Sequence, residues 1–101
     1  MYQSATMILI NKEILDTFKR DYPDAASAVD AWTAEVELTT WRTPHELLQS
    51  FPSADIPGDR QAIFNIRGNR YRLWVKVAYN SGTVFVKAIG THKEYDEWAI
   101  K

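Results

Sequence analysis

The sequence predicts an α+β fold: a single compact domain with an antiparallel sheet packed against an N-terminal helical hairpin, and a short C-terminal helix. Two observations support this prediction. Apolar residues recur at helical spacing in the first half of the chain, whereas they alternate with a period of two from Ala62 onward. The 101 residues are enough for one hydrophobic core but not for two, so we expect one domain.

The composition indicates an ordinary folded protein of a reducing compartment. The hydrophobic share of 46% argues against disorder, and the absence of Cys excludes disulfide scaffolds and thiolate metal sites. No apolar run approaches the roughly 20 residues that span a bilayer, and residues 1–6 lack the features of a signal peptide. We therefore expect a cytoplasmic protein without a membrane partner.

The N-terminal half is predicted to form a strand, two helices and a third, shorter helix. The β-branched run Thr6–Ile10 is expected to be the strand. Asn11 is placed to cap the first helix and Asp24 the second, with Pro23 between them. Thr43-Pro44-His45-Glu46 is a capping pattern that opens the short helix, and residues 51–60 are expected to be a surface loop. The apolar stripes of the helical hairpin are expected in the core: Ile14, Leu15, Phe18, Tyr22, Val29, Trp32 and Val36.

The C-terminal half is predicted to form a three-stranded antiparallel meander that is followed by a helix. Gly68-Asn69 and Asn80-Ser81-Gly82 contain residues that tolerate positive φ, so each is expected to be a tight turn. Thr91-His92-Lys93-Glu94 is a capping box that opens the terminal helix. The predicted strands are Ala62–Arg67, Arg70–Tyr79 and Thr83–Ile89.

The charge is distributed unevenly, although the whole chain has a formal net charge of only −1. Residues 1–61 contain five basic and ten acidic side chains, whereas residues 62–101 contain seven basic and three acidic ones. Such an asymmetry within one domain predicts two surfaces of opposite sign, and a polyanion would bind the C-terminal one. A chance imbalance of solvated charges is the alternative.

One face of the strand 70–79 is the main candidate for binding nucleic acid. Tyr71, Leu73, Val75, Val77 and Tyr79 alternate onto the face that covers a core, so the other face receives cations and an aromatic ring. Cations interleaved with an aromatic ring can hold phosphates and stack a base. The alternative is the solvated face of an amphipathic strand. The residues of the second face are Arg70, Arg72, Trp74, Lys76 and Ala78.

Neighbouring residues extend this candidate surface. Arg67 is expected opposite Arg70 across the first turn, and because like charges in that position repel, an anion could compensate them. Lys87 on the next strand could add a cation, although its register is open. His92 and Tyr95 lie three residues apart on one side of the terminal helix, where His92 could transfer a proton. A first-turn surface histidine without a catalytic role is the alternative.

Other classes of site have no support in the sequence. The two His are far apart and have no ligand spacing around them, so no metal site is expected. There is no glycine-rich phosphate loop and no nucleophile elbow, and no pair of carboxylates falls on a predicted cleft face. We expect no cofactor.

Two motifs resemble the signature of the HigB-type toxins, a group of the RelE-like toxin–antitoxin superfamily. They are Phe64-Asn65-Ile66-Arg67-Gly68-Asn69-Arg70-Tyr71-Arg72-Leu73 and Gly90-Thr91-His92-Lys93-Glu94-Tyr95-Asp96. The passage 46–55 is also similar to the family's helix-to-loop segment. The resemblance covers residues 7–101, so residues 1–6 are expected to be an N-terminal extension of the toxin domain.

The resemblance implies a RelE-like fold and ribosome-dependent cleavage of messenger RNA in the ribosomal A site. It implies metal-independent attack by the ribose 2′-OH on the adjacent phosphate, and neutralisation by a helix-turn-helix antitoxin of the HigA type. Arg72 matches the family's arginine that stabilises the phosphorane, His92 its acid and Tyr95 the aromatic that orients the nucleotide. The residues expected to hold the RNA are Arg67, Arg70, Trp74, Lys76 and Lys87.

Two other functions remain open at this point. A non-catalytic module could use the same basic sheet face to bind RNA or the ribosome, without needing His92 and Tyr95 on one side of a helix. A degenerate toxin could be retained as a protein-interaction partner, although neither motif looks eroded. The general base is not assigned, because the chain offers no obvious carboxylate for that role.

Overall fold

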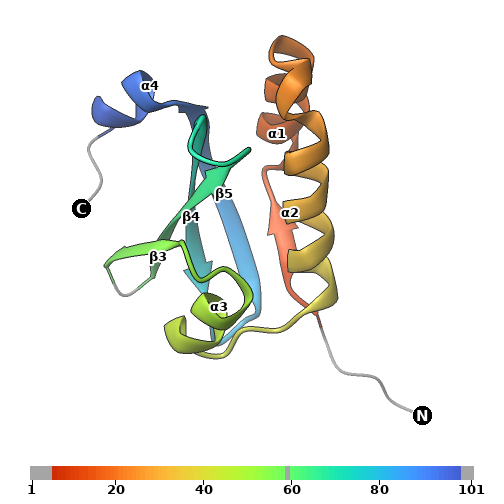
Figure 1. Cartoon of the computed structure of the whole chain (residues 1–101). Coiled ribbons are helices and arrows are strands. Elements are labelled where there is room, and N and C mark those ends of the chain that lie inside the picture. The colour runs from red at the N-terminus through yellow and green to blue at the C-terminus, as the bar shows by residue number, and fades with distance from the viewer. Residues whose placement is uncertain (1–5, 59, 99–101) are drawn as a thin grey trace.

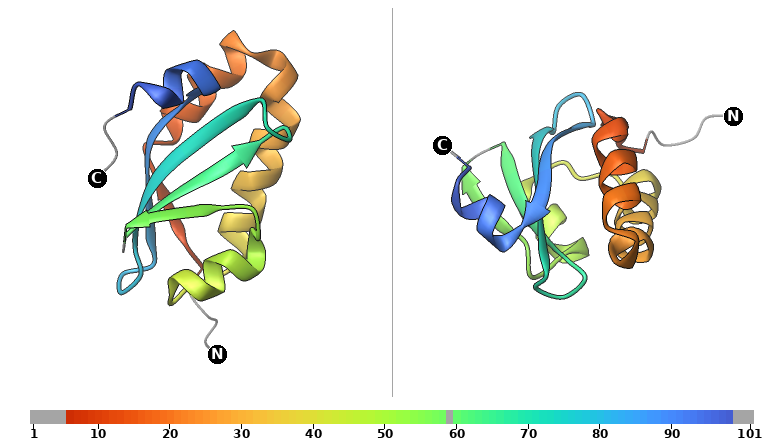
Figure 2. Two further views of the ribbon diagram at one scale, coloured as in Figure 1. Left: turned by 60° about the vertical axis from the view of Figure 1, so that its left-hand side comes forward. Right: turned by 90° about the horizontal axis from the view of Figure 1, so that it is seen from above.

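A five-stranded sheet of order β1-β5-β4-β3-β2 separates a helical hairpin on one side from a short terminal helix on the other (Figures 1 and 2). The computed structural model describes residues 6–58 and 60–98. The expected N-terminal extension therefore lies almost wholly outside the described residues. The helices are α1 (Lys12–Asp21), α2 (Ala26–Leu38), α3 (Pro44–Ser50) and α4 (His92–Asp96), with a 3₁₀ turn at Pro23–Ala25. The strands are β1 (Ile8–Ile10), β2 (Asp55–Gly58), β3 (Gln61–Ile66), β4 (Tyr71–Ala78) and β5 (Thr83–Thr91).

The predicted α+β class, the helical hairpin and the antiparallel meander β3-β4-β5 are confirmed. β1 adds to the meander at one edge by pairing in parallel with β5. At the other edge, β2 lies within the segment 51–60, where a loop was expected. The loop prediction was wrong because Pro57 and Gly58 are typical of turns, yet a short edge strand tolerates both.

Two of the predicted helix caps form and two do not. The hydroxyls of Thr43 and Thr91 each accept a backbone N–H of the helix that follows. Asn11 instead adopts the left-handed region (φ 70°), and its amide donates to the carbonyl of Val86 at 3.2 Å. Asp24 lies inside the 3₁₀ turn, so its carboxylate faces the β3–β4 loop instead of the start of α2. Long-range contacts thus replace both of the local caps.

The core lies between the hairpin and the inner face of the sheet. The predicted β4 face is buried there, with Leu73 and Val75 fully inaccessible to solvent. Phe64 is the centre of an aromatic cluster, with an edge contact to Trp32 at 5.3 Å and a stacked contact to Trp41 at 6.2 Å. Each such side chain contributes roughly 1.5–3 kcal/mol through burial alone. This packing orients the opposite face of β4 towards α4.

Asp24 links the helical hairpin to the loop between β3 and β4. Its Oδ2 accepts from the Tyr71 hydroxyl and from Nη1 of Arg67, both at 2.8 Å. The hydrogen bond from Tyr71 and the charge of Arg67 lower the pKa of Asp24, and the same carboxylate raises the pKa of Tyr71. Residues 67–70 lie outside the regular ladder, because Arg67 takes a positive φ of 53°. The Arg70 N–H still donates to the Arg67 carbonyl at 3.2 Å, so the tight turn at Gly68-Asn69 forms as predicted.

We predict that Asp24→Asn lowers the free energy of unfolding at pH 7 and that the loss shrinks in acid. The lowered pKa means that the carboxylate contributes stability above its unfolded pKa of about 3.9, and that this contribution disappears as pH falls through the folded pKa. Urea unfolding at pH 7 and pH 3 would measure it. Asp21→Asn, at an exposed carboxylate, is the control. A loss that is equal at both pH values would contradict the role of the charge.

Candidate functional site

A β-bulge in β5 determines which side chains reach the outer face of the sheet, the face on the side of α4. Val75 pairs with Val86 but Trp74 pairs with Ala88, so Lys87 is an extra residue without a partner on β4. Lys87 and Ala88 therefore both belong to the outer face, and Gly90 comes to lie opposite Arg72. This bulge fixes the register of Lys87, whose Nζ lies 6.0 Å from the centroid of the Trp74 ring.

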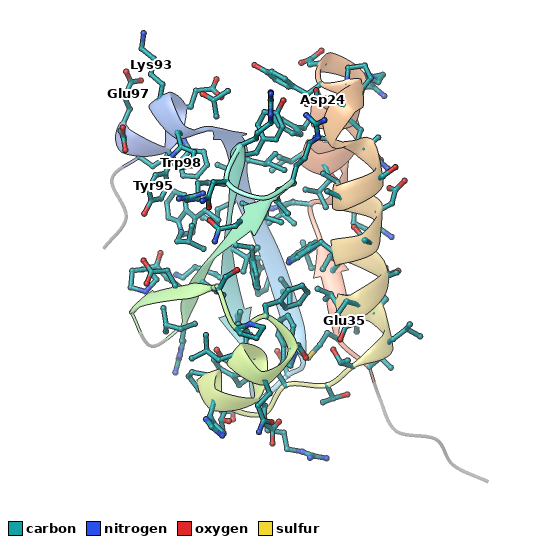
Figure 3. The ribbon with its side chains drawn as sticks, viewed as in Figure 1. Asp24, Glu35, Lys93, Tyr95, Glu97 and Trp98 are labelled. Atoms are coloured by element: carbon teal, nitrogen blue, oxygen red, sulfur yellow. The ribbon has the colours of Figure 1, made fainter. Side chains whose placement is uncertain are left out.

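A chain of ring contacts connects Arg72 to α4. The guanidinium carbon of Arg72 lies 5.6 Å from the centroid of the Tyr95 ring, a cation–π distance. Tyr95 meets Trp98 edge to face at 5.6 Å, and Trp98 stacks on Trp74 at 6.0 Å. Tyr95 and Trp98 lie beside the strands in Figure 3, while Lys93 on α4 and Glu97 directly after this helix point away from them. We refer to Arg72, Trp74, Lys87, Tyr95 and Trp98 as the cationic aromatic cluster.

Arg72 has a donor that no group in the described part of the chain satisfies. Its Nη1 is inaccessible to solvent and has no hydrogen-bond partner there. No carboxylate among the described residues forms a salt bridge with this guanidinium either. A buried and unpaired cationic N–H is costly, because it has lost hydration without gaining a hydrogen bond. An anion could satisfy this donor only after the groups that cover it move, because the atom has no access to solvent.

The remaining residues predicted for the site are distributed differently. Arg67 and Arg70 face Asp24: Arg67 is ion-paired with it, and the charge of Arg70 helps to lower its pKa. The Asp24 carboxylate thus supplies the negative charge near Arg67 and Arg70 that the sequence pattern assigns to an external anion. Lys76 is exposed on the outer face, and His92 is exposed at the start of α4. The structure assigns neither of these two a hydrogen bond to a described residue.

Trp74 is more constrained than its sequence position suggested. Its indole N–H donates to Oε1 of Gln61 at 2.8 Å, and its ring stacks against Trp98. Trp98 is the cluster member that the sequence reasoning missed. The available signal was its spacing, since Trp98 follows Tyr95 by three residues and lies on the same side of a helical turn.

Gly90 and the capping box hold α4 against the sheet. The Thr91 hydroxyl accepts from the Glu94 N–H at 3.2 Å, and the Glu94 carboxylate accepts from the Thr91 N–H at 2.8 Å. The Glu94 side chain folds over Gly90, where a β-carbon would collide with its carboxylate. A glycine at this position therefore allows the turn that brings Tyr95 to Arg72.

The cluster lies outside two grooves of the described structure, neither of which is lined by any of its residues. One groove of about 430 Å³ lies between α1 and Ile89, and another of about 530 Å³ adjoins Tyr79 and Arg60. Small-molecule sites are usually concave, whereas polymers bind along surfaces. Within residues 6–58 and 60–98, no three His, Cys, Asp or Glu side chains gather as metal ligands. No helix of that same part is long and apolar enough to cross a membrane.

We predict that Gly90→Ala and Thr91→Ala each loosen α4 without unfolding the domain, whereas Thr91→Ser does not. Loss of a side-chain cap costs about 1 kcal/mol, which weakens a five-residue helix more than the core. The near-UV circular dichroism of the stacked Trp74–Trp98 pair should fall in the two alanine variants. An unchanged spectrum in both would show that the cap does not position α4.

Comparison with known proteins assigns the chain to a family. A profile of the HigB toxin family, described as the RelE-like toxic component of a toxin–antitoxin system, matches residues 25–98. The mRNA interferase toxin HigB of Escherichia coli K12 is 29% identical over 92 residues, which cover 89% of this chain and 88% of the relative. The mRNA interferase HigB of Shigella flexneri is equally similar, and that of Escherichia coli O6:H1 is 29% identical over 93 residues, with 90% of each chain covered. The cationic aromatic cluster thus lies within the matched region, and the chain belongs to the HigB family of RelE-like toxins.

Proposed function

We propose that the protein is a ribosome-dependent endoribonuclease that cleaves messenger RNA without a metal, as the toxin of a toxin–antitoxin pair. The observation that carries this proposal is the buried, unpaired N–H of Arg72 beside Tyr95, on a face rich in cations. A phosphate would satisfy this donor and a nucleotide would contact the aromatic ring. The names of the relatives, all mRNA interferases, support the same substrate.

The reaction is an internal transesterification. The ribose 2′-OH attacks the adjacent phosphorus, the bond from phosphorus to the 5′ oxygen breaks, and a 2′,3′-cyclic phosphate and a 5′-OH are formed. Arg72 stabilises the extra negative charge of the phosphorane through the N–H groups of its guanidinium. A proton acceptor that we do not assign, from the toxin or the ribosome, takes the proton of the 2′-OH.

The groups around Arg72 take the supporting roles. His92 protonates the leaving 5′ oxygen, which is consistent with its exposed place at the start of α4. Tyr95 orients the scissile nucleotide by contact with its base or ribose. Lys76 and Lys87 hold flanking phosphates, while Arg67 and Arg70 can contribute only if the RNA competes with Asp24.

The partner that neutralises the toxin is, in this proposal, a helix-turn-helix antitoxin of the HigA type. Membership of a toxin–antitoxin family supports an antitoxin in general. The acidic side chains of residues 1–61 offer a surface for a basic segment of such a protein. In this arrangement the acidic helical side and the cationic sheet face serve different partners.

We predict that Arg72→Ala and His92→Gln each abolish cleavage in a translating extract with a reporter mRNA, read by primer extension. Loss of one donor to the transition state costs about 10²–10³ in rate, and Arg72→Lys should recover only part of it because Lys lacks the planar fork. Cuts that persist in His92→Gln would remove this residue as the acid. Absence of ribosome-dependent cuts from folded wild type would favour the alternative, a non-catalytic RNA-binding module.

We also predict that Tyr95→Phe retains most of the cleavage activity, whereas Tyr95→Ala loses about tenfold or more of it. The ring contacts Arg72 and Trp98, and both contacts need the aromatic face more than the hydroxyl. The same primer-extension assay measures the difference, and Lys93→Ala, at a residue that points away from the sheet, is the control (Figure 3). Equal losses in both Tyr95 variants would indicate that the hydroxyl takes part in the chemistry.

A further inference from the structure

We propose that Phe85 is a stacking platform for one base of the bound RNA, beside the cleavage site and distinct from it. The inference rests on the proposed function in taking messenger RNA as the ligand. Phe85 belongs to the outer face of β5 and is 37% exposed. No aromatic side chain among the described residues contacts its ring.

The surroundings of Phe85 suit a nucleotide. Lys76 is its direct neighbour across the ladder on β4, and Lys87 lies two positions further along β5 on the same face. The outer-face positions of β4 and β5 hold no carboxylate, so nothing there repels a phosphate. Those positions are Arg72, Trp74, Lys76 and Ala78 on β4, and Thr83, Phe85, Lys87, Ala88 and Gly90 on β5. An exposed ring between two cations is the arrangement that binds single-stranded nucleic acid.

The other ring of this face is less suited to a base. Trp74 is held by its hydrogen bond to Gln61 and by its stacking on Trp98, so one of its faces is already covered. Phe85 lies level with Lys76, which is four residues along β4 from Arg72. At about 3.3 Å per residue this distance is roughly 13 Å, which a single strand of RNA spans within a few nucleotides. The base on Phe85 would therefore lie within a few nucleotides of the scissile position.

A protein partner is the competing occupant of this surface. Ile10 on β1 is the other neighbour of Phe85 in the sheet, and Ile8 and Ile10 are 58% and 39% exposed. The three side chains form a small apolar patch of the kind that partners cover. We favour RNA because the apolar patch adjoins Lys76 on β4 and Lys87 on β5, and these cations can bind phosphates. RNA and a protein partner should respond differently to Phe85→Leu, which keeps an apolar side chain but removes the aromatic ring.

The test is the affinity of the toxin for ribosomes programmed with a short mRNA that carries a 2′-deoxy nucleotide at the scissile position and so cannot be cleaved. Phe85→Leu should weaken binding roughly tenfold and Phe85→Trp should preserve it, since stacking needs a π face. A set of mRNAs with one abasic position each then locates the base. At one abasic position the wild-type protein should lose as much affinity as the Phe85→Leu substitution costs on intact mRNA. The Phe85→Leu variant should lose no further affinity on that same abasic mRNA.

Ile10→Ala is the matched control, because it alters the same patch without touching a ring. The proposal would be overturned if Phe85→Leu bound every mRNA as tightly as the wild-type protein does. It would also be overturned if the losses of affinity caused by the variant and by the abasic position were additive. Weakened binding of the antitoxin by both Phe85→Leu and Ile10→Ala, with unchanged mRNA binding, would assign the patch to a protein. Affinity is measured on mRNA that cannot be cleaved, so the result does not depend on the nuclease mechanism. A failure of this proposal can therefore be distinguished from a failure of that mechanism. Thermal melts of each variant establish that it is folded.

Discussion

The β-bulge at Lys87 is the constraint on which the site depends. If β5 had no bulge, strict alternation from Val86 onward would direct Ala88 and Gly90 to the core and Ile89 to solvent. The extra residue restores the alternation beyond it, so Ile89 packs towards the core and Gly90 faces Arg72. It also places Lys87 beside Trp74. The direction in which β5 enters α4, and hence the position of Tyr95, follows from the same irregularity.

The sheet separates two electrostatic environments. On the side of the hairpin, the carboxylate of Asp24 draws Arg67 away from the outer face and fixes the β3–β4 loop. On the opposite side, Arg72 has no carboxylate partner among the residues described and lies against rings. Because paired arginines are already satisfied and Arg72 is not, the two arginines differ in their capacity to bind a phosphate.

Tyr95 on α4 and Trp98, which follows this helix, keep Arg72 in a partly dehydrated position. Tyr95 covers the guanidinium, Trp98 supports Tyr95, and Trp74 supports Trp98 from the sheet. A guanidinium held against rings is weakly hydrated, so its attraction for a phosphate is less screened than that of a solvated lysine. This arrangement explains how a chain with a formal net charge of −1 can present a local site for a polyanion. Binding of a polyanion depends on the electrostatic potential at one face of the protein, which cannot be inferred from the net charge of the whole chain.

The sequence by itself determined the elements that depend on local patterns. Alternation over 71–78 and helical spacing over 12–38 predicted the meander and the hairpin, and the capping box predicted α4. The resemblance singles out Arg72 and Tyr95, whereas periodicity assigns them only to a face of the strand and a side of the helix. Only the tertiary structure decided the partner of Asp24, the existence of β2, the bulge at Lys87 and the stacking of Trp98 on Trp74. These features depend on contacts between residues far apart in the chain, where packing and charge pairing outweigh local preference, so no local pattern records them.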